Sequence, residues 1–306
     1  MDRLKIGIPR GLFYYQNRFM WKYFFDKINC ETVISNKTNR EIINLGIKYS
    51  NDEMCLSLKT YVGHVASLIN RCDYILVPRI DNYGLKNQSC TNFLAAYDIV
   101  CNLFDKKIIN YNIDYVHGRE EKDAYLQVGK LLGKSKRESA LAYEYAKVKS
   151  NKEKKKNYID SMNKLNSLKT KILLVGHDYN FEDEMVGKPI IEYLCRENCE
   201  VIKCYEIPEN LTNSLSFKIS KTLYWKQNRE NIGSIPYCLD KIDGIILLSS
   251  FPCGPDSIVN ELVLRRVKFP ILNLIVDDLS SFSGFETRLE SFLDIVKNKN
   301  KSHSYD

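Results

Sequence analysis

The stretch LKIGIPRGLFYYQNRFMWKYFFDKINCETVI, residues 4–34, decides the fold class. It begins with an apolar run over 4–8 that predicts a short strand, which Pro9 ends. The aromatic-rich run over about 14–28 predicts a helix, and residues 31–34 predict a second strand. A strand, a helix and a second strand in quick succession are typical of a parallel sheet with helices on its faces.

The same alternation continues along the chain and restarts in its second half. We expect further helices over 39–49, 54–71, 185–197, 256–267 and 287–296, and strands over 73–77, 172–175, 199–204, 244–248 and 271–276. Residues 119–168 have no proline and no β-branched runs, so they predict one or two connecting helices. The sequence therefore predicts an α/β protein with two Rossmann-like domains, mainly parallel sheets, over 1–118 and 169–306, joined by that helical segment.

Composition narrows the functional classes. The chain has 306 residues, of which 44% are hydrophobic and 27% charged, and this excludes a disordered protein. No apolar run reaches the roughly 20 residues that span a bilayer, and the first residues do not resemble a signal peptide, so we expect a cytoplasmic protein without membrane contact. Most of the net charge of +7 falls within 119–168, where it indicates a solvated helix face, and we expect no nucleic-acid partner.

Ten cysteines are many for a cytoplasmic protein. A reducing cytosol argues against a disulfide framework, which leaves metal ligands and core residues. The chain contains no CxxC pair, which excludes a zinc ribbon or a ferredoxin loop, so a metal site must be assembled from distant cysteines.

Position along the chain separates the cysteines into two groups. Ligands of open α/β sheets bind beyond the carboxyl ends of the strands, and Cys253 lies there, where a helix N-terminus favours the thiolate. Cys55 lies at a predicted helix start and Cys90 in a polar loop before an apolar helix. The other seven have contexts that predict buried core residues, among them Cys30, Cys101, Cys195 and Cys199. Position alone leaves open whether Cys55, Cys90 and Cys253 form one metal site.

Six longer motifs carry a resemblance to a known family. They are KIGIPRGLFYYQNRFMWKYFF, DEMCLSLKTYVGHVASL and DYILVPRI in the first half, and VGHDYNFED, FPCGPDS and DDLSSFSGFETRLESFLD in the second. Together these motifs resemble the DUF2229 family of acyl-CoA dehydratase activase-related proteins. The last motif is also similar to the end of 2-hydroxyacyl-CoA (2-hydroxyglutaryl-CoA) dehydratase subunits.

The resemblance implies an iron–sulfur protein. The motif cysteines of the family fall on Cys55, Cys90 and Cys253, which implies a [4Fe–4S] cluster held by three thiolates between the two domains. We therefore expect low-potential electron transfer or dehydratase-like reductive chemistry in an anaerobic cytoplasm. The implied partners are an ATP-dependent activase or a dehydratase subunit, with an acyl-CoA as substrate. Three thiolates leave one cluster corner exposed, which favours a homo-oligomer or a covering partner.

The sequence also departs from the family and leaves alternatives open. Where the family usually has proline, this chain has Ser57 and Thr91, and the acidic, Gly-rich stretch before 287–290 is reduced. Neither half has a phosphate-binding GxGxxG or GKT loop, so the chain is not itself the ATP-using partner. Whether it is an enzyme, a lyase similar to the 2-hydroxyacyl-CoA dehydratases, stays open. The alternatives are a non-catalytic cluster-bearing accessory or scaffold, and a structural zinc site of the same cysteines.

Two histidines lie near these motifs. His64 follows Cys55 by nine residues on one predicted helix, about 13 Å along its axis, so we expect it to form a helix–helix hydrogen bond and not to share a cluster with Cys55. His177 follows a predicted strand and is the candidate for a catalytic proton donor, with a role in fixing its loop as the alternative.

Overall fold

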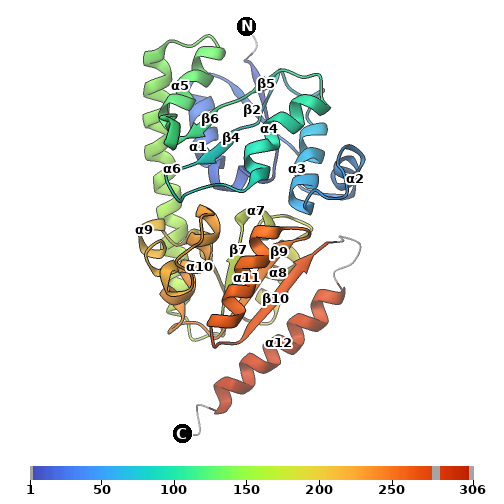
Figure 1. Ribbon diagram of the computed structural model, residues 1–306, viewed down its shortest axis with the longest axis vertical. Helices are drawn as coiled ribbons and strands as arrows, with labels where there is room; N and C mark the ends of the chain where they lie inside the picture. Colours follow the sequence, from blue (N-terminus) through green and yellow to red (C-terminus); the bar gives the residue numbers. More distant parts are fainter. Residues whose placement is uncertain (1–2, 278–282, 303–306) are drawn as a thin grey trace. The chain divides into compact units, whose positions relative to one another are not determined.

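A computed structural model describes residues 3–277 and 283–302 of the chain (Figure 1). The chain divides into two compact units, Met1–Lys155 and Lys156–Asp306. Each unit contains a four-stranded sheet in which all neighbouring strands are parallel, with helices between successive strands. The predicted class, Rossmann-like α/β units with parallel sheets and a helical connection, is confirmed.

The sheet of the first unit has the strand order β2-β1-β3-β5. Its strands are β1 (Lys5–Ile8), β2 (Glu31–Ile34), β3 (Tyr74–Leu76) and β5 (Ile108–Ile109). A second pair of parallel strands, β4 (Arg79–Asn82) and β6 (Asn112–Asp114), follows β3 and β5 along the chain. Because β4 and β6 end at polar residues, this small sheet brings several polar side chains together at its carboxyl edge.

The helices of the first unit bury their aromatic and aliphatic faces. They are α1 (Tyr14–Lys27), α2 (Arg40–Tyr49), α3 (Leu56–Ala66), α4 (Thr91–Leu103) and α5 (Glu121–Leu131). A short 3₁₀ turn, η1 (Tyr115–His117), precedes α5. The long helix α6 (Lys136–Leu165) follows α5 and continues into the second unit. Trp21 on α1 is almost fully buried and donates its indole N–H to the Tyr111 hydroxyl at 3.0 Å. Such a pairing allows a large polar aromatic residue to lie in the core.

Helices α2 and α3 cross at glycine. A Cβ atom on Gly63 would clash with the backbone carbonyl of Ile42, and one on Gly46 would clash with that of Lys59. The absence of side chains at both positions therefore lets the two helix backbones come into direct contact. This crossing fixes α3, whose first turn begins directly after Cys55.

The sheet of the second unit has the order β10-β9-β7-β8. Its strands are β7 (Lys171–Gly176), β8 (Glu200–Lys203), β9 (Gly244–Ser250) and β10 (Ile271–Val276). All seven residues of β9 are buried, as expected for a strand covered on both faces. The helices are α7 (Asp178–Phe181), α8 (Lys188–Arg196), α9 (Glu209–Thr212), α10 (Lys226–Cys238), α11 (Gly254–Arg266) and α12 (Ser283–Ser302), with 3₁₀ turns η2 (Cys204–Glu206) and η3 (Leu215–Lys218).

Some elements differ from the sequence prediction. Helix α3 ends at Ala66, earlier than the predicted residue 71, and α12 is longer than predicted. Helix α10 and the β4–β6 pair were not predicted, because Pro236 lies inside α10 and Pro78 interrupts the strand signal. Throughout the described ranges, every helix is too short or too polar to cross a lipid bilayer.

Candidate functional site

The three motif cysteines share one structural position. Cys55 is the N-cap of α3, Cys90 of α4 and Cys253 of α11, and each has an extended backbone conformation. An N-cap residue lies beside the backbone N–H groups of the first helical turn, which have no partner within the helix. Together with the positive end of the helix dipole, these N–H groups favour negative charge on a cysteine sulfur.

Cys55 and Cys90 belong to the first unit, where the starts of α3 and α4 lie close together. The Asn92 side chain, in the first turn of α4, donates its amide to Cys55 Sγ at 3.3 Å. Cys55 is buried, with 8% of its surface exposed, whereas Cys90 is half-buried. The first unit therefore places two cysteine-capped helices side by side, with an amide donor directed at one of the sulfurs.

Cys253 belongs to the second unit, at the carboxyl end of β9. It is half-buried, and its thiol donates a hydrogen bond to the carboxylate of Asp256, three residues later. The Ser257 hydroxyl donates to the Cys253 carbonyl at 2.7 Å and closes the first turn of α11. Cys253 is thus tied to the helix that it caps through both its side chain and its backbone.

Asp256 is the centre of a buried polar network. Its Oδ1 accepts from His177 Nε2 at 3.0 Å and from the Asn228 side-chain amide at 2.6 Å, and all three residues are buried. His177, the N-cap of α7, also stacks on the Tyr179 ring with centroids 4.8 Å apart. The structure therefore joins His177 to Cys253 through Asp256.

The network holds a charged pair. Burial alone would lower the pKa of His177, but the charge and hydrogen bond of Asp256, helped by Asp178, raise it above the usual value. Burial alone would raise the pKa of Asp256, yet His177, Asn228 and the Cys253 thiol together lower it. Both shifts favour an imidazolium–carboxylate pair, which holds a proton next to Cys253.

His64 is not part of a site with Cys55. Its Nδ1 bonds the Ser35 hydroxyl at 3.0 Å, and its Nε2 bonds the Thr38 hydroxyl at 3.1 Å. Burial, with a smaller effect of Arg10, lowers the pKa of His64 to about 3, so the imidazole is neutral. His64 is hydrogen-bonded as predicted, but the prediction of a helix–helix bond is wrong, because both partners lie in the segment between β2 and α2.

The remaining cysteines divide differently from the prediction. Cys30 and Cys199 are buried as predicted, together with three further cysteines: Cys72, Cys204 and Cys238. Burial raises the pKa of the Cys199 thiol to about 11 and of the Cys238 thiol to about 12, so these thiols stay protonated and inert.

The prediction that Cys101 and Cys195 are buried is wrong, because both are exposed. Each follows directly after a buried residue of its helix, Val100 on α4 and Leu194 on α8. Successive residues of a helix point in different directions, so a cysteine next to a core position turns towards solvent.

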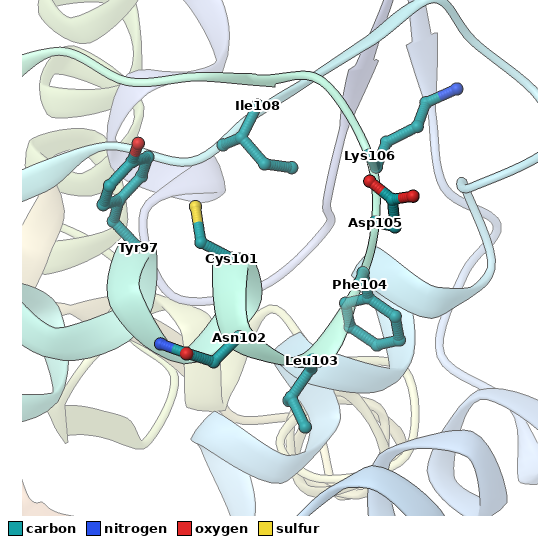
Figure 2. Close-up of a pocket in the computed structure, with 8 residues that line it drawn as sticks. All are labelled: Tyr97, Cys101, Asn102, Leu103, Phe104, Asp105, Lys106 and Ile108. Atoms are coloured by element: carbon teal, nitrogen blue, oxygen red, sulfur yellow. The ribbon is translucent and has the colours of Figure 1, made fainter.

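Two cavities lie in the first unit, away from the motif cysteines. The first, of about 410 Å³, lies at the end of α4, and Figure 2 shows Tyr97 and Cys101 projecting from this helix near Ile108. The second, of about 590 Å³, lies at the amino ends of β1, β3 and β5, beside Cys72 and Lys106. Neither cavity is lined by a motif cysteine or by His177.

Sequence reasoning selected the N-cap cysteines and His177 but missed Asp256 and Asn228. Asp256 had a usable signal, because an acidic residue three positions after an N-cap is a recognised capping pattern. Asn228 had none, since its contact depends on packing of α10. Residues 278–282 of the last family motif lie outside the described residues.

Comparison with known proteins gives one family. The sequence model of the family described as CoA enzyme activase uncharacterised domain (DUF2229) matches residues 5–206, well over half of the chain. The matched range contains Cys55, Cys90 and His177 and ends before Cys253. A search of curated proteins finds no match.

Among solved structures, the chain matches one titled "Structure of the SBP FpvC from pseudomonas aeruginosa in complex with Mn2+". The sequences are 14% identical, and the match covers 98% of this chain and 100% of that chain. The TM-score is 0.28, which is too low for this likeness to carry an argument about fold or function.

Proposed function

This chain belongs to the DUF2229 family, described as a CoA enzyme activase uncharacterised domain, and from that premise we propose that it is an iron–sulfur protein. The proposed cofactor is a [4Fe–4S] cluster with Cys55, Cys90 and Cys253 as its ligands. Three thiolates leave one iron without a protein ligand, open to water, to a substrate or to a partner.

The observation that supports this proposal most is the shared N-cap position of the three cysteines. Soft thiolates are the ligands that iron–sulfur clusters require, and a helix N-terminus stabilises negative charge on sulfur. The five buried cysteines other than Cys55 have thiols whose pKa is raised by burial, so they stay protonated and do not suit this role. The donor set of the chain therefore fits the cluster.

Residues around the three cysteines would affect the reduction potential of the cluster and the position of its ligands. The first-turn N–H groups of α3, α4 and α11 and the Asn92 amide would donate to cluster sulfurs, and such donors raise the reduction potential. Asp256, held by His177 and Asn228, would fix the start of α11 and so the direction of Cys253.

When bound, the cluster supplies one-electron transfer at low potential. We propose that an ATP-dependent activase gives the electron, because this chain has no phosphate-binding loop of its own. The electron would pass to a dehydratase subunit or to a bound acyl-CoA, in an anaerobic cytoplasm. A second candidate is a non-catalytic accessory that carries the cluster for another enzyme.

The decisive measurement is the iron and acid-labile sulfide content of the full chain, with its visible spectrum, after strictly anaerobic purification. We expect about four irons per chain and broad visible absorption. Cys253→Ser should lose both, and so should Cys55→Ser and Cys90→Ser.

Cys101→Ser is the matched control, because Cys101 is an exposed helical cysteine outside the ligand set. It should keep the iron content of the wild type. Zinc in place of iron, lost in the same three variants, would replace the redox proposal with a structural zinc site. Iron that is insensitive to all three substitutions would refute the ligand assignment.

A second assay separates enzyme from accessory. The cluster-loaded chain is mixed with an activase, ATP, a low-potential one-electron reductant such as dithionite and a 2-hydroxyacyl-CoA, and dehydration is followed. Turnover supports the enzymatic form of the proposal, whereas cluster reduction without turnover supports the accessory.

A further inference from the structure

A second group of metal-binding side chains lies at the carboxyl edge of the small β4–β6 sheet. Asp81 comes from β4, Asp114 from the end of β6 and His117 from η1, and one ligand atom of each lies within 4.8 Å of the others. These three residues share no member with the cysteine ligands, and both sequence reasoning and the family resemblance passed over them.

The charges of this group are not balanced by the usual partners. Along the described chain, neither Asp81 nor Asp114 forms an ion pair with a lysine or an arginine, and the one side chain of basic type beside them is His117, whose Nδ1 lies 2.7 Å from Asp114. Asp81 receives one side-chain hydrogen bond, from the neighbouring Asn82 amide at 3.3 Å. The group therefore holds two carboxylates whose ligand atoms lie within 4.8 Å of each other, an arrangement that a bound cation would stabilise.

The surroundings hold the ligands in place. The side-chain amide of Asn82 donates to the Asp114 carboxylate at 2.7 Å, and the side-chain oxygen of Asn82 accepts from the backbone N–H groups of Gly84 and Val116. A ligand fixed by a hydrogen-bonding neighbour is typical of metal sites in proteins.

We propose that Asp81, Asp114 and His117 bind a divalent cation, with water completing its coordination. Two carboxylates and one imidazole suit a first-row divalent ion better than Ca²⁺, which prefers six to eight oxygen ligands. Ligands at about 2.1 Å from an ion lie at most about 4.2 Å apart. The His117 side chain is 70% exposed, so little packing prevents it from adjusting to an ion.

This site would brace the loop that leads to Cys90. The backbone carbonyl of Asp81 accepts from Ser89 N at 2.8 Å, and Asp114 exchanges two backbone hydrogen bonds with Arg119. A cation joining the ends of β4 and β6 therefore fixes residues 83–89 from one side, directly before the N-cap of α4. The inference does not depend on the iron–sulfur proposal.

Mn²⁺ is the probe, because it is paramagnetic and has little affinity for thiolates, so it does not report on the cysteines. The full chain is titrated with Mn²⁺, and free ion is followed by electron paramagnetic resonance. We expect one ion per chain, and binding at least about tenfold weaker in Asp81→Asn and in His117→Gln. Bound Mn²⁺ should also slow amide hydrogen exchange over 83–89 in the wild type.

Asp123→Asn, which removes an exposed carboxylate on α5, and Cys101→Ser, which removes an exposed thiol on α4, are the controls, and both should bind as the wild type does. No binding by the wild type up to about 1 mM Mn²⁺ would overturn the proposal. Unchanged affinity in Asp81→Asn, or loss of binding in Asp123→Asn, would place the ion elsewhere. Melting temperatures without metal show whether each variant is folded.

Discussion

At the scale of single residues, local environment divides ten cysteines into different chemical classes. Those in the core have thiols whose pKa is raised by burial, whereas Cys55, Cys90 and Cys253 lie at helix N-termini. The second unit adds a charged His177–Asp256 pair next to one of these helix starts. The same residue type can therefore be an inert filler or a ligand, depending on the backbone around it.

The buried pair makes the stability of the second unit depend on pH. The raised pKa of His177 and the lowered pKa of Asp256 mean that both groups are charged between about pH 4 and 6.5. In that range His177→Gln should lower the free energy of unfolding by about 3 kcal/mol, because it leaves a buried carboxylate without its cation. The contribution of His177 is lost as pH rises through its raised pKa, and that of Asp256 as pH falls through its lowered pKa.

Urea unfolding of wild type and His177→Gln at pH 5.5 and pH 9 measures this effect. The difference between the two proteins should be large at pH 5.5 and smaller at pH 9. His117→Gln is the control, because its pair with Asp114 involves an exposed imidazole and should contribute at most about 1 kcal/mol. An equal difference at both pH values would mean that His177 is neutral in the folded protein.

How far single residues could be predicted depended on how local their environment is. The position of Cys253 follows from a strand, a proline and a glycine within a few neighbouring residues, and the sequence shows it directly. The bond between His177 and Asp256 joins residues 79 positions apart and needs the sheet to form first. The prediction that Cys101 is buried failed for a similar reason, because the exposure of this residue depends on which face of α4 packs inward.

At the scale of elements, the α2–α3 crossing is what holds the Cys55 helix. Gly63→Ala should destabilise the protein by at least about 2 kcal/mol, because the new methyl group meets the Ile42 carbonyl. Chemical unfolding monitored by circular dichroism checks this. Gly254→Ala is the matched control: a Cβ there meets no atom within 4 Å, so the variant should be as stable or more stable by about 0.5–1 kcal/mol.

A Gly63→Ala variant as stable as the wild type would show that the two helices are not in backbone contact.

Elements with strong periodicity, such as α1 and β9, were predictable because one pattern and one burial state persist along them. Short elements beside proline, such as β4 after Pro78, were not, because their strand character comes from pairing with β6. Helix α10 was not predicted either, because it contains Pro236, which usually ends or excludes a helix.

At the scale of the whole molecule, helix α6 is the covalent link between the two compact units. The unit boundary falls at Lys155 and Lys156, inside this helix. Lys155→Pro should break α6 there, at a cost of about 3 kcal/mol in that helix, while the sheets of both units remain folded. Because the proposed cluster needs ligands from both units, iron content should fall in Lys155→Pro but not in Lys155→Ala.

Anaerobic iron analysis beside near-ultraviolet circular dichroism separates the two effects. Full iron content in a correctly folded Lys155→Pro variant would show that cluster binding does not need a continuous α6.

The division of the fold into two α/β halves was predictable, because the strand–helix alternation visibly restarts near residue 171. The arrangement of ligands across the halves was suggested only by the family motifs.

The distribution of cysteines over the two units has a consequence for biosynthesis. Cys55 and Cys90 leave the ribosome long before Cys253, since more than half of the chain separates them from it. A nascent first unit therefore carries only two of the three proposed ligands until Cys253 has been translated. Under the proposed function, loading of the cluster is completed only after the second unit has been synthesised.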